Sequence, residues 1–406
     1  MIPRTRRPPD GAGPSGSSSF TGPQLALLAS GFFVNVINFS VYPYIAVLLR
    51  DRMDLGMEQV GIVLGVATFV QFAGGLPGAA LAERIGLQRC LLASMVVQTL
   101  GSLGFLLGGT WPLVTVAALY LRSAASALYS PSVRSYMLWG ADERERPRLV
   151  SASFASGNVG IALGPVLGAL FIGAPGGLFV TMTVLHLAMT MGHALLPRDR
   201  SEERETVEPL RRALRGLAVL PFLVTALTLY LHMHFYQYLS SYAEGRVPTM
   251  FYGVAMMGYS LALSVLQPLL AERVERMRYT HAMILGFAGL AVGTAAFTGG
   301  SEIAIAVGVL AIGAGNSVLF LKNTLEALAH TKRSPAVTFG HQRLAEGTGA
   351  FLSGILGGAL YQVFESDGRL PGFWWAVATQ CVLLPAIVLF AARGRRGAAP
   401  ETVGAP

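Results

Sequence analysis

Charged residues are scarce in this chain, since Asp, Glu, Lys and Arg together make up only 13% of its 406 residues. A soluble protein of this length carries roughly twice that charged fraction. Hydrophobic residues make up 53%, and the mean hydropathy is +0.54. Apolar runs recur along the whole chain, and a run of about 20 residues is long enough to cross a bilayer. The low charge therefore predicts an all-α polytopic membrane protein.

Sequence features of enzymes and of secreted proteins are also missing. The two cysteines, Cys90 and Cys381, fall within or at the edge of expected spans, so a disulfide framework is not indicated. The sequence has no Walker phosphate-binding loop, no zinc-ligand spacing and no nucleophile elbow of a hydrolase. We therefore expect no enzyme activity, no metal site and no cofactor.

Hydropathy, together with the turn-forming and charged residues that interrupt the apolar runs, predicts twelve transmembrane helices. They are expected at 24–49, 59–82, 90–109, 112–132, 150–173, 177–197, 217–240, 250–271, 281–299, 302–325, 338–362 and 371–392. If both termini are cytoplasmic, the outer loops hold only four basic residues, namely Arg50, Arg52, Arg246 and Arg369. Most other basic residues then lie on the inner side, as the positive-inside rule requires. The net charge of +8 is thus a topology signal and not a nucleic-acid-binding surface. We expect a multi-pass protein of the plasma membrane, the inner membrane in a bacterial cell.

An internal repeat divides the chain at about half its length. Ala82-Glu83-Arg84-Ile85 recurs as Ala271-Glu272-Arg273-Val274, 189 residues later. Three glycines, at positions 157, 164 and 168, match three others at 347, 354 and 358, each 190 positions on. Such doubling implies two equivalent halves, which is how many secondary transporters are built.

The repeat and the composition together predict five segments. Two six-helix bundles are expected at 23–197 and 216–393, and disordered cytoplasmic tails at 1–22 and 394–406. Between the bundles, 198–215 is expected to be a cytoplasmic linker, serving either as a solvated connector or as a regulatory binding site.

The stretch that follows the second expected span, AALAERIGLQR from Ala79 to Arg89, resembles a known loop signature. This is the Gly-x-Leu-Ala-Asp-Arg-x-Gly-Arg-Lys/Arg motif of the major facilitator superfamily. Glu83 holds the acid position, Arg84 the first basic position and Gly86 the second glycine, while Arg89 stands in for a later basic residue. The chain departs from the motif at Ala79, Leu87 and Gln88.

This resemblance implies the superfamily's fold, with twelve transmembrane helices in two pseudo-symmetric six-helix bundles. It also implies that the loop is a conformational latch, with Glu272 and Arg273 as its copy in the second half. Charge pairs at helix ends can break when two halves rock apart. Alternatively, the basic residues of this tight loop lie on the cytoplasmic side only because of the positive-inside rule and have no latch role.

The fifth expected span resembles the superfamily's antiporter motif, Gly-x-x-x-Gly-Pro-x-x-Gly-Gly. Its matching residues are Gly160, Gly164, Pro165 and Gly168, with Ala169 in place of the last glycine. Glycines spaced by four let helices approach closely, and proline bends a helix. The motif implies export; general close packing is the alternative. Segments around Pro131, Pro221 and His341 extend the resemblance to the drug:proton antiporter-1 branch of bacterial multidrug exporters.

Two charged residues inside expected spans are candidates for proton coupling. Arg122 lies near the middle of the fourth span, where an unpaired charge is costly, so it has either a coupling role or a structural ion pair. Glu346 lies well inside the eleventh span, one turn from Arg343. It serves either coupling or substrate binding, or else it is neutralised by that arginine. The first span offers no acid, because its polar residues are Asn35 and Asn38.

Histidines of the seventh span add two further candidates. An unperturbed histidine titrates near neutrality, so His232 and His234 are candidates for a proton relay, although their spacing points them to different sides of a helix. The alternative is an aromatic belt at the membrane interface, near the outer end of the span. Polar or aromatic residues expected to line a substrate cavity, or else to form interhelical hydrogen bonds, are Asn35, Asn38, Tyr42, Gln71, Tyr236 and Asn316.

Three functions remain open from the sequence. The first is a proton-coupled exporter of small hydrophobic or amphipathic compounds that works by alternating access, a monomer whose partners are its substrate, protons and lipid. The second is an uncoupled facilitator or an importer of a specific metabolite, which the acid-free first span favours. The third is a non-transporting membrane sensor on a transporter fold.

Overall fold

A computed structural model describes residues 20–139, 141, 145–199, 216–331 and 335–397. The expected tails and the expected linker lie largely outside these residues. The first half comprises α1 (Gly22–Val41), η1 (Tyr42–Tyr44), α2 (Ile45–Met53), α3 (Met57–Ala73), α4 (Gly75–Ile85), α5 (Leu87–Leu107), α6 (Pro112–Leu138), α7 (Arg146–Phe171) and α8 (Pro175–Ala194). The second half comprises α10 (Val219–Ala243), α11 (Thr249–Arg276), α12 (Tyr279–Phe297), α13 (Glu302–Ala329), α14 (Pro335–Leu352), η2 (Ser353–Gly357), α15 (Gly358–Ser366) and α16 (Leu370–Gly397).

The helices have the length and composition of membrane spans. Within the described residues, ten helical segments are long and apolar enough to cross a membrane, and the pair α3 and α4 forms an eleventh that is bent by 46°. At the eleventh expected span, 338–362, α14, η2 and α15 run without interruption from Pro335 to Ser366. This segment is less apolar because α14 carries His341, Arg343 and Glu346.

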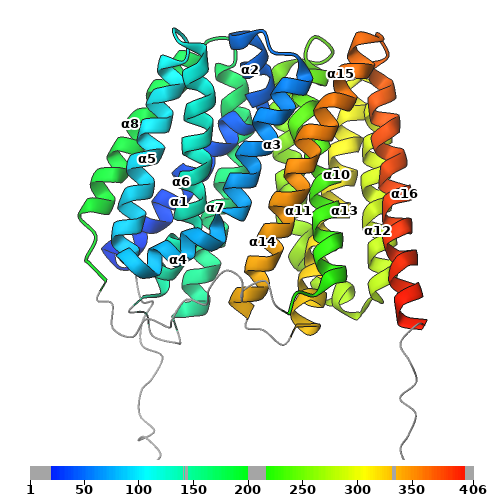
Figure 1. Cartoon of the computed structure of the whole chain (residues 1–406). Helices are drawn as coiled ribbons and strands as arrows, with labels where there is room; N and C mark the ends of the chain where they lie inside the picture. The colour runs from blue at the N-terminus through cyan, green and yellow to red at the C-terminus, as the bar shows by residue number, and fades with distance from the viewer. Residues whose placement is uncertain (1–19, 140, 142–144, 200–215, 332–334, 398–406) are drawn as a thin grey trace, which may run out of the picture.

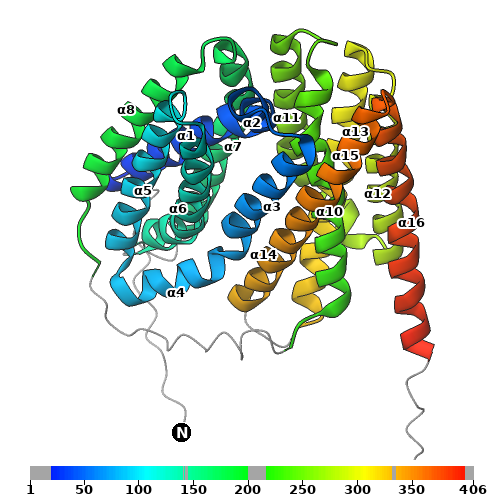
Figure 2. The same cartoon turned by 45° about the horizontal axis from the view of Figure 1, so that its top comes forward.

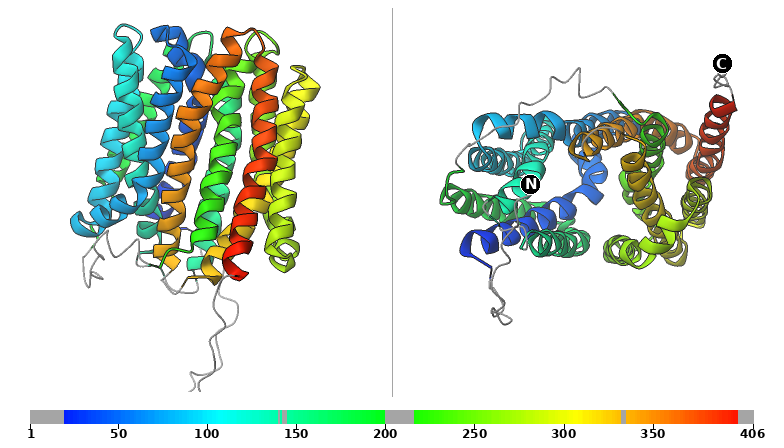
Figure 3. Two further views of the ribbon diagram at one scale, coloured as in Figure 1. Left: turned by 45° about the vertical axis from the view of Figure 1, so that its right-hand side comes forward. Right: turned by 90° about the horizontal axis from the view of Figure 1, so that it is seen from below.

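The two halves repeat one packing pattern. α1 packs along α7 as α10 packs along α14, and α5 contacts α6 and α8 as α12 contacts α13 and α16. Figure 3 shows the two groups of helices side by side. The expected fold, an all-α membrane protein of two pseudo-symmetric six-helix bundles, is confirmed.

Contact between the halves runs mainly through two helix pairs. α3 packs along α14 and η2, and α11 packs along α7; the neighbouring α3 and α14 can be followed in Figure 2. Glycines allow the close approach, since a Cβ on Gly61 would collide with the carbonyl oxygen of Gly354, and one on Gly65 would lie 3.0 Å from that of Phe351. In the orientation of Figure 1, the described chain begins and ends at the lower end, here called the base, and the opposite end is called the top.

Two expected spans are interrupted. The first breaks into α1 and α2 at the 3-10 turn Tyr42–Tyr44, where Pro43 has no backbone N–H to continue the helix. The second bends between α3 and α4 at Gly74, whose neighbour Gly75 also lacks a side chain. Both expected spans are present, and each contains a break in its helix at these points. By contrast, α7 continues through Pro165.

Candidate functional site

Arg122 lies inside the first bundle and is only 1% exposed. It sits near the middle of α6, and its side chain passes over Gly101 of α5, where a Cβ would lie 2.5 Å from the arginine Cγ. A larger residue at position 101 would therefore displace the guanidinium. The absence of a side chain at Gly101 makes room for this buried cation.

Neutral groups from three helices surround the Arg122 guanidinium. Its Nη2 donates to Asn38 Oδ1 of α1 at 2.5 Å, and its Nη1 donates to Ser102 Oγ of α5 at 2.7 Å. His186 Nδ1 of α8 lies 2.9 Å from the same Ser102 oxygen. Among the described residues, the structure shows no ion pair to Arg122. The sequence analysis identified Arg122 and Asn38 but assigned no role to Ser102 or His186. The one signal for these two residues was that they are polar residues within apolar spans.

Glu346 is bound by an arginine of its own helix. Its Oε2 lies 2.9 Å from Arg343 Nη1, one turn earlier on α14. The Arg343 guanidinium also lies over the ring of Phe72 on α3, 5.7 Å from the ring centre, and so contacts the other bundle. Arg134 of α6 interacts electrostatically with both Arg343 and Glu346. In this conformation Glu346 therefore pairs with Arg343, which was the alternative to a coupling or substrate role. Arg343 and Glu346 of the second half lie with Phe72 and Arg134 of the first half near the base.

His232 and His234 are buried inside the second bundle, at 7% and 0% exposure. The amide Nδ2 of Asn316 on α13 lies 3.0 Å from His232 Nδ1 and donates to Tyr259 Oη at 3.2 Å. His234 Nδ1 lies 2.7 Å from the Tyr230 carbonyl oxygen and 3.1 Å from Ser353 Oγ. The two rings thus point to different neighbours, as their spacing implied. The alternative of an interfacial belt is wrong, because both side chains lie within the bundle and not on its outer face.

The expected cavity residues lie in several places. Asn35 donates to Gly31 O of its own helix at 2.8 Å, and Gln71 is half-buried on α3. Tyr42 and Tyr236 approach each other from opposite halves through Phe39, whose ring centre is 6.3 Å from each of theirs. Asn38 belongs to the Arg122 cluster and Asn316 to the His232 cluster. Of the six, Tyr42 and Tyr236 lie where the bundles meet.

Gln237, which the sequence did not single out, lies beside this aromatic contact. It is 5% exposed on α10, a helix that packs on η1 and α2 of the other half. Neither its Oε1 nor its Nε2 has a hydrogen-bond partner among the described residues. Buried amides are normally hydrogen-bonded, so this position suits a polar group of a ligand or a water molecule.

The loop between α4 and α5 is held by a residue far along the chain. Gly86 adopts φ +97°, and the carboxylate of Asp199 accepts hydrogen bonds from Leu87 N at 2.8 Å and Gln88 N at 3.0 Å. Arg84 and Arg89 are exposed. In the repeat copy, Glu272 pairs with Arg276 one turn on at 2.5 Å, and Arg273 is exposed. The latch role of these residues stays a prediction.

The antiporter-like motif packs α7 tightly onto α1. A Cβ on Gly160 would lie 2.5 Å from Phe32 O, one on Gly164 would lie 2.6 Å from Phe39 Cβ, and one on Gly168 would collide with Ser40 O. Pro165 O accepts a hydrogen bond from Tyr44 Oη at 2.6 Å. Gly253 of α11 also approaches this proline. The motif therefore lies where both halves meet.

Several polar contacts join the halves at the top. Arg50 Nη1 of α2 lies 2.9 Å from Glu365 Oε1 of α15, and Met57 N donates to Gln362 Oε1 at 2.6 Å. Tyr252 Oη donates to Pro43 O at 3.2 Å. At the end of α10, burial and the nearby carboxylate of Asp51 raise the pKa of Glu244, while Arg50 opposes the shift. These contacts hold the two bundles together at this end.

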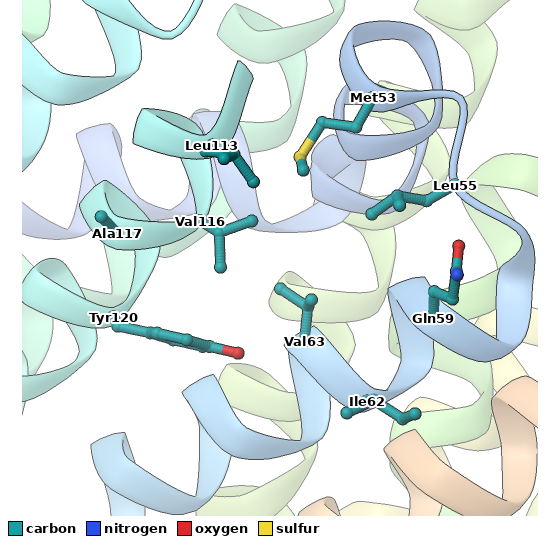
Figure 4. A pocket seen from close by; sticks show the side chains of 9 residues that line it. All are labelled: Met53, Leu55, Gln59, Ile62, Val63, Leu113, Val116, Ala117 and Tyr120. Atoms are coloured by element: carbon teal, nitrogen blue, oxygen red, sulfur yellow. The ribbon is translucent and has the colours of Figure 1, made fainter. Parts of the chain in front are cut away.

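A cavity of about 550 Å³ lies between α3 and α6 within the first half, near the top. It is lined by Met53, Leu55, Gln59, Ile62, Val63, Leu113, Val116, Ala117 and Tyr120, which Figure 4 shows. None of the residues expected to line a substrate cavity is among them. Its walls are almost wholly apolar and come from one half only, so it differs from a site between the bundles.

Sequence comparisons with known proteins match part of the chain. A family model described as the Major Facilitator Superfamily matches residues 27–247. An uncharacterized MFS-type transporter of Mycobacterium tuberculosis (strain H37Rv) is 30% identical over 205 residues, which cover 47% of this chain and 46% of that protein. Multidrug resistance protein MdtH of Photorhabdus laumondii is 27% identical over 142 residues, covering 35% of this chain and 34% of that protein. The aligned part thus spans about half the length of the first relative and a third of the second.

Solved structures share the fold over nearly their full length. The nucleoside transporter NupG superposes with a TM-score of 0.74 at 12% identity, covering 92% of this chain and 100% of that one. The POT family transporter PepTSo superposes with a TM-score of 0.76 at 13% identity, covering 94% and 99%. At this identity, the likeness shows the fold alone.

Proposed function

Because this chain belongs to the Major Facilitator Superfamily, we propose that it is a secondary transporter of the drug:proton antiporter-1 type. In this proposal, it exports small hydrophobic or amphipathic compounds across the plasma membrane by alternating access, with protons as the coupling ion. Two of its curated relatives, named as multidrug resistance proteins, support export. The antiporter-like glycines of α7 support it as well.

The observation that carries the coupling proposal is the isolated charge of Arg122. A cation this deeply buried is expensive unless it is paired or hydrated, yet among the described residues its guanidinium has only the neutral partners Asn38 and Ser102. A charge retained at such a cost is expected to serve the transport cycle. Glu346 is the acid proposed to exchange protons, and His232 and His234 are secondary candidates.

Orientation and moving parts belong to the same proposal. We place both termini in the cytoplasm, so the base faces inward and the contacts of Arg50, Met57 and Tyr252 close the outer side. The moving units are 23–197 and 216–393, connected by the linker 198–215. The polar side chains of Gln237, Tyr236 and Tyr42 would meet the substrate between them, in a protein that works as a monomer.

Flux measurements in proteoliposomes with an imposed pH gradient test this function. We expect substrate movement to follow the gradient, and Glu346→Gln or Arg122→Ala to abolish this dependence. Arg369→Gln is the matched control, because Arg369 is exposed in the turn before α16 and lies outside the proposed coupling and latch residues. Flux that ignores the gradient, or that both variants leave unchanged, would contradict proton coupling.

A second candidate is an uncoupled facilitator or an importer of a specific metabolite. Two observations favour it: α1 offers Asn35 and Asn38 where many relatives place an acid, and Glu346 is already bound by Arg343. Counterflow separates the two functions. Saturable exchange of labelled for unlabelled substrate with no gradient, together with no response to pH, would favour the facilitator.

A further inference from the structure

The imidazole ring of His232 lies among four aromatic rings inside the second bundle. Tyr259 of α11 stacks on it, with 5.7 Å between ring centres and 21° between ring planes. The ring centres of Phe235, Tyr236 and Phe320 lie at 5.6, 5.8 and 6.2 Å. Aromatic rings attract cations through their faces. This surrounding therefore offsets part of the cost of burying a protonated imidazole.

The polar partner of this ring is an amide, a group that can present either a donor or an acceptor. Asn316 Nδ2 lies 3.0 Å from His232 Nδ1 and donates to Tyr259 Oη at 3.2 Å. Because Nδ2 can only donate, Nδ1 has to accept, so the proton of the neutral ring is on Nε2. Asn316 is 0% exposed, and its Oδ1 has no hydrogen-bond partner among the described residues. The amide thus holds an unused acceptor next to the histidine.

Turning the amide of Asn316 over would reverse both contacts without losing either. Oδ1 would accept a hydrogen bond from a proton on His232 Nδ1. It would also accept one from the hydroxyl group of Tyr259, which can donate as well as accept. Nδ2 would then be the unpaired group in place of Oδ1. The site therefore satisfies the neutral and the protonated imidazole with the same number of hydrogen bonds.

No fixed charge competes for this histidine, since the structure shows no ion pair to His232 among the described residues. The titratable groups that face its ring from α10 and α11 are the hydroxyl groups of Tyr236 and Tyr259, and α13 contributes Asn316 and Phe320. His234, two residues along α10, contacts Ser353 instead. Charged side chains farther along α11, α13 and α14 are engaged elsewhere: Lys322 Nζ with Glu275 O, Glu272 with Arg276, Glu326 with His330, and Arg343 with Glu346.

From this geometry we infer that His232, Tyr259 and Asn316 form a proton-binding site, in which the Asn316 amide turns over as the ring is protonated. Nδ1 takes the proton from water and the ring becomes an imidazolium, while no other covalent bond changes. His232 is 7% exposed in this conformation. Tyr236, beside it, packs against Phe39 of the other half at 6.3 Å. The proton therefore enters or leaves when the bundles part at this contact, which links protonation to alternating access. This role in coupling rests on the proposed transport function, whereas the site itself does not.

Solid-state nitrogen NMR of the full-length protein, with isotope-labelled histidine in proteoliposomes, tests the site. The two ring nitrogens have different signals in each neutral tautomer and in the imidazolium, and His232→Gln identifies the signals of His232. At alkaline pH we expect the tautomer with its proton on Nε2, and on acidification the imidazolium. Asn316→Leu removes the acceptor and should lower the midpoint by about one pH unit, a tenfold loss of proton affinity. Asn316→Asp should raise it, because a carboxylate favours the cation.

Asn323→Leu is the matched control on the same helix. Asn323 contacts Pro221 O and Tyr279 Oη and not His232, so the midpoint should stay unchanged. A neutral ring with its proton on Nδ1, a ring that never protonates while the protein stays folded, or a midpoint that neither Asn316 variant shifts would overturn the inference. Protonation as expected in a protein whose flux ignores a pH gradient would contradict the proposed function alone. Proton-driven flux whose pH dependence Asn316→Leu and Asn316→Asp leave unchanged would contradict only the coupling role of this site.

Discussion

The amide of Asn38 holds the guanidinium of Arg122, with Nη2 of the arginine 2.5 Å from Oδ1 of the asparagine. This contact joins α6 to α1 through a neutral partner. A carboxylate at the same place would neutralise the arginine and fix its position. The pair therefore keeps a net charge in the first bundle, and this charge can be removed by a single substitution.

Asn38→Asp should stabilise the protein and impair its proposed coupling. A hydrogen bond between two charged groups is stronger than one with a neutral partner by about 1 kcal/mol, so the unfolding temperature should rise by about 2 °C. Proton-driven flux should fall, because Arg122 is now neutralised. Asn35→Asp is the control, since Asn35 bonds to Gly31 O and not to Arg122. An equal gain in stability from both variants would contradict the pairing.

Breaking the ion pair of Arg50 and Glu365 should shift the protein towards a top-open conformation. The pair joins the two halves and is partly exposed, and such a pair contributes about 0.5–1 kcal/mol. The population of the top-closed form should thus fall about two- to fivefold. Distances between spin labels on the top ends of α2 and α15 measure the change. Cys90 and Cys381 are buried and should not take up the label.

Exchanging the two charges, as Arg50→Glu with Glu365→Arg, provides the control for this experiment. The double variant should recover part of the closed population that each single variant loses. If the single and double variants have the same label distances as the unsubstituted protein, the pair does not contribute to closure.

The closed top should also respond to pH through Glu244. Burial and the carboxylate of Asp51, which belongs to the other half, raise the pKa of Glu244 above its usual value. A group with a raised pKa binds its proton more tightly in this conformation, so acidification from neutral pH should favour the closed top. Glu244→Gln should remove this part of the pH dependence of the label distance. A dependence that persists in full would assign the effect to another group.

Gly61→Ala should separate α3 from η2. The added Cβ would collide with Gly354 O, and overpacking of this kind costs roughly 1–3 kcal/mol. The same labels should report a larger open population. Gly31→Ala is the matched control, because a Cβ there has no neighbour within 4 Å; it should leave the distances unchanged. Equal effects of both substitutions would point to helix propensity instead of packing.

Asp199→Ala should loosen the start of α5. The carboxylate caps Leu87 N and Gln88 N, and loss of such a cap costs about 1 kcal/mol. Hydrogen exchange of these two amides should accelerate about fivefold, while Asp199→Asn should have a smaller effect. Unchanged exchange in the alanine variant would contradict the capping role.

Much of the architecture is predictable because apolar length and the repeat follow directly from the order of residues. The pairing of Arg343 with Glu346 is also local, since residues three apart share one side of a helix. Contacts that depend on tertiary structure were not predictable. Asp199 reaches the start of α5 from 112 residues away, and no local pattern marks it as a cap.

The histidines show a second limit. The aromatic residues next to His232 and His234 in the sequence are typical of a membrane–water interface and also of a bundle interior. The two histidines lie in the interior because α13 and η2 pack against them, and this packing cannot be read from the sequence. Likewise, the sequence does not predict the 3-10 turn at Pro43 or the bend at Gly74. Proline and glycine permit a break in a helix, but whether the helix breaks depends on how it packs against its neighbours. Many transmembrane helices contain the same residues and do not break.

The buried charge of Arg122, which has only neutral partners among the described residues, would make the proposed transport cycle sensitive to voltage. Moving one elementary charge through a membrane potential of 100 mV changes its free energy by about 2.3 kcal/mol. With the base inward, as proposed, an inside-negative potential would favour the conformation that holds the Arg122 guanidinium nearer the cytoplasm. The step that moves this charge outward would then slow as the potential grows.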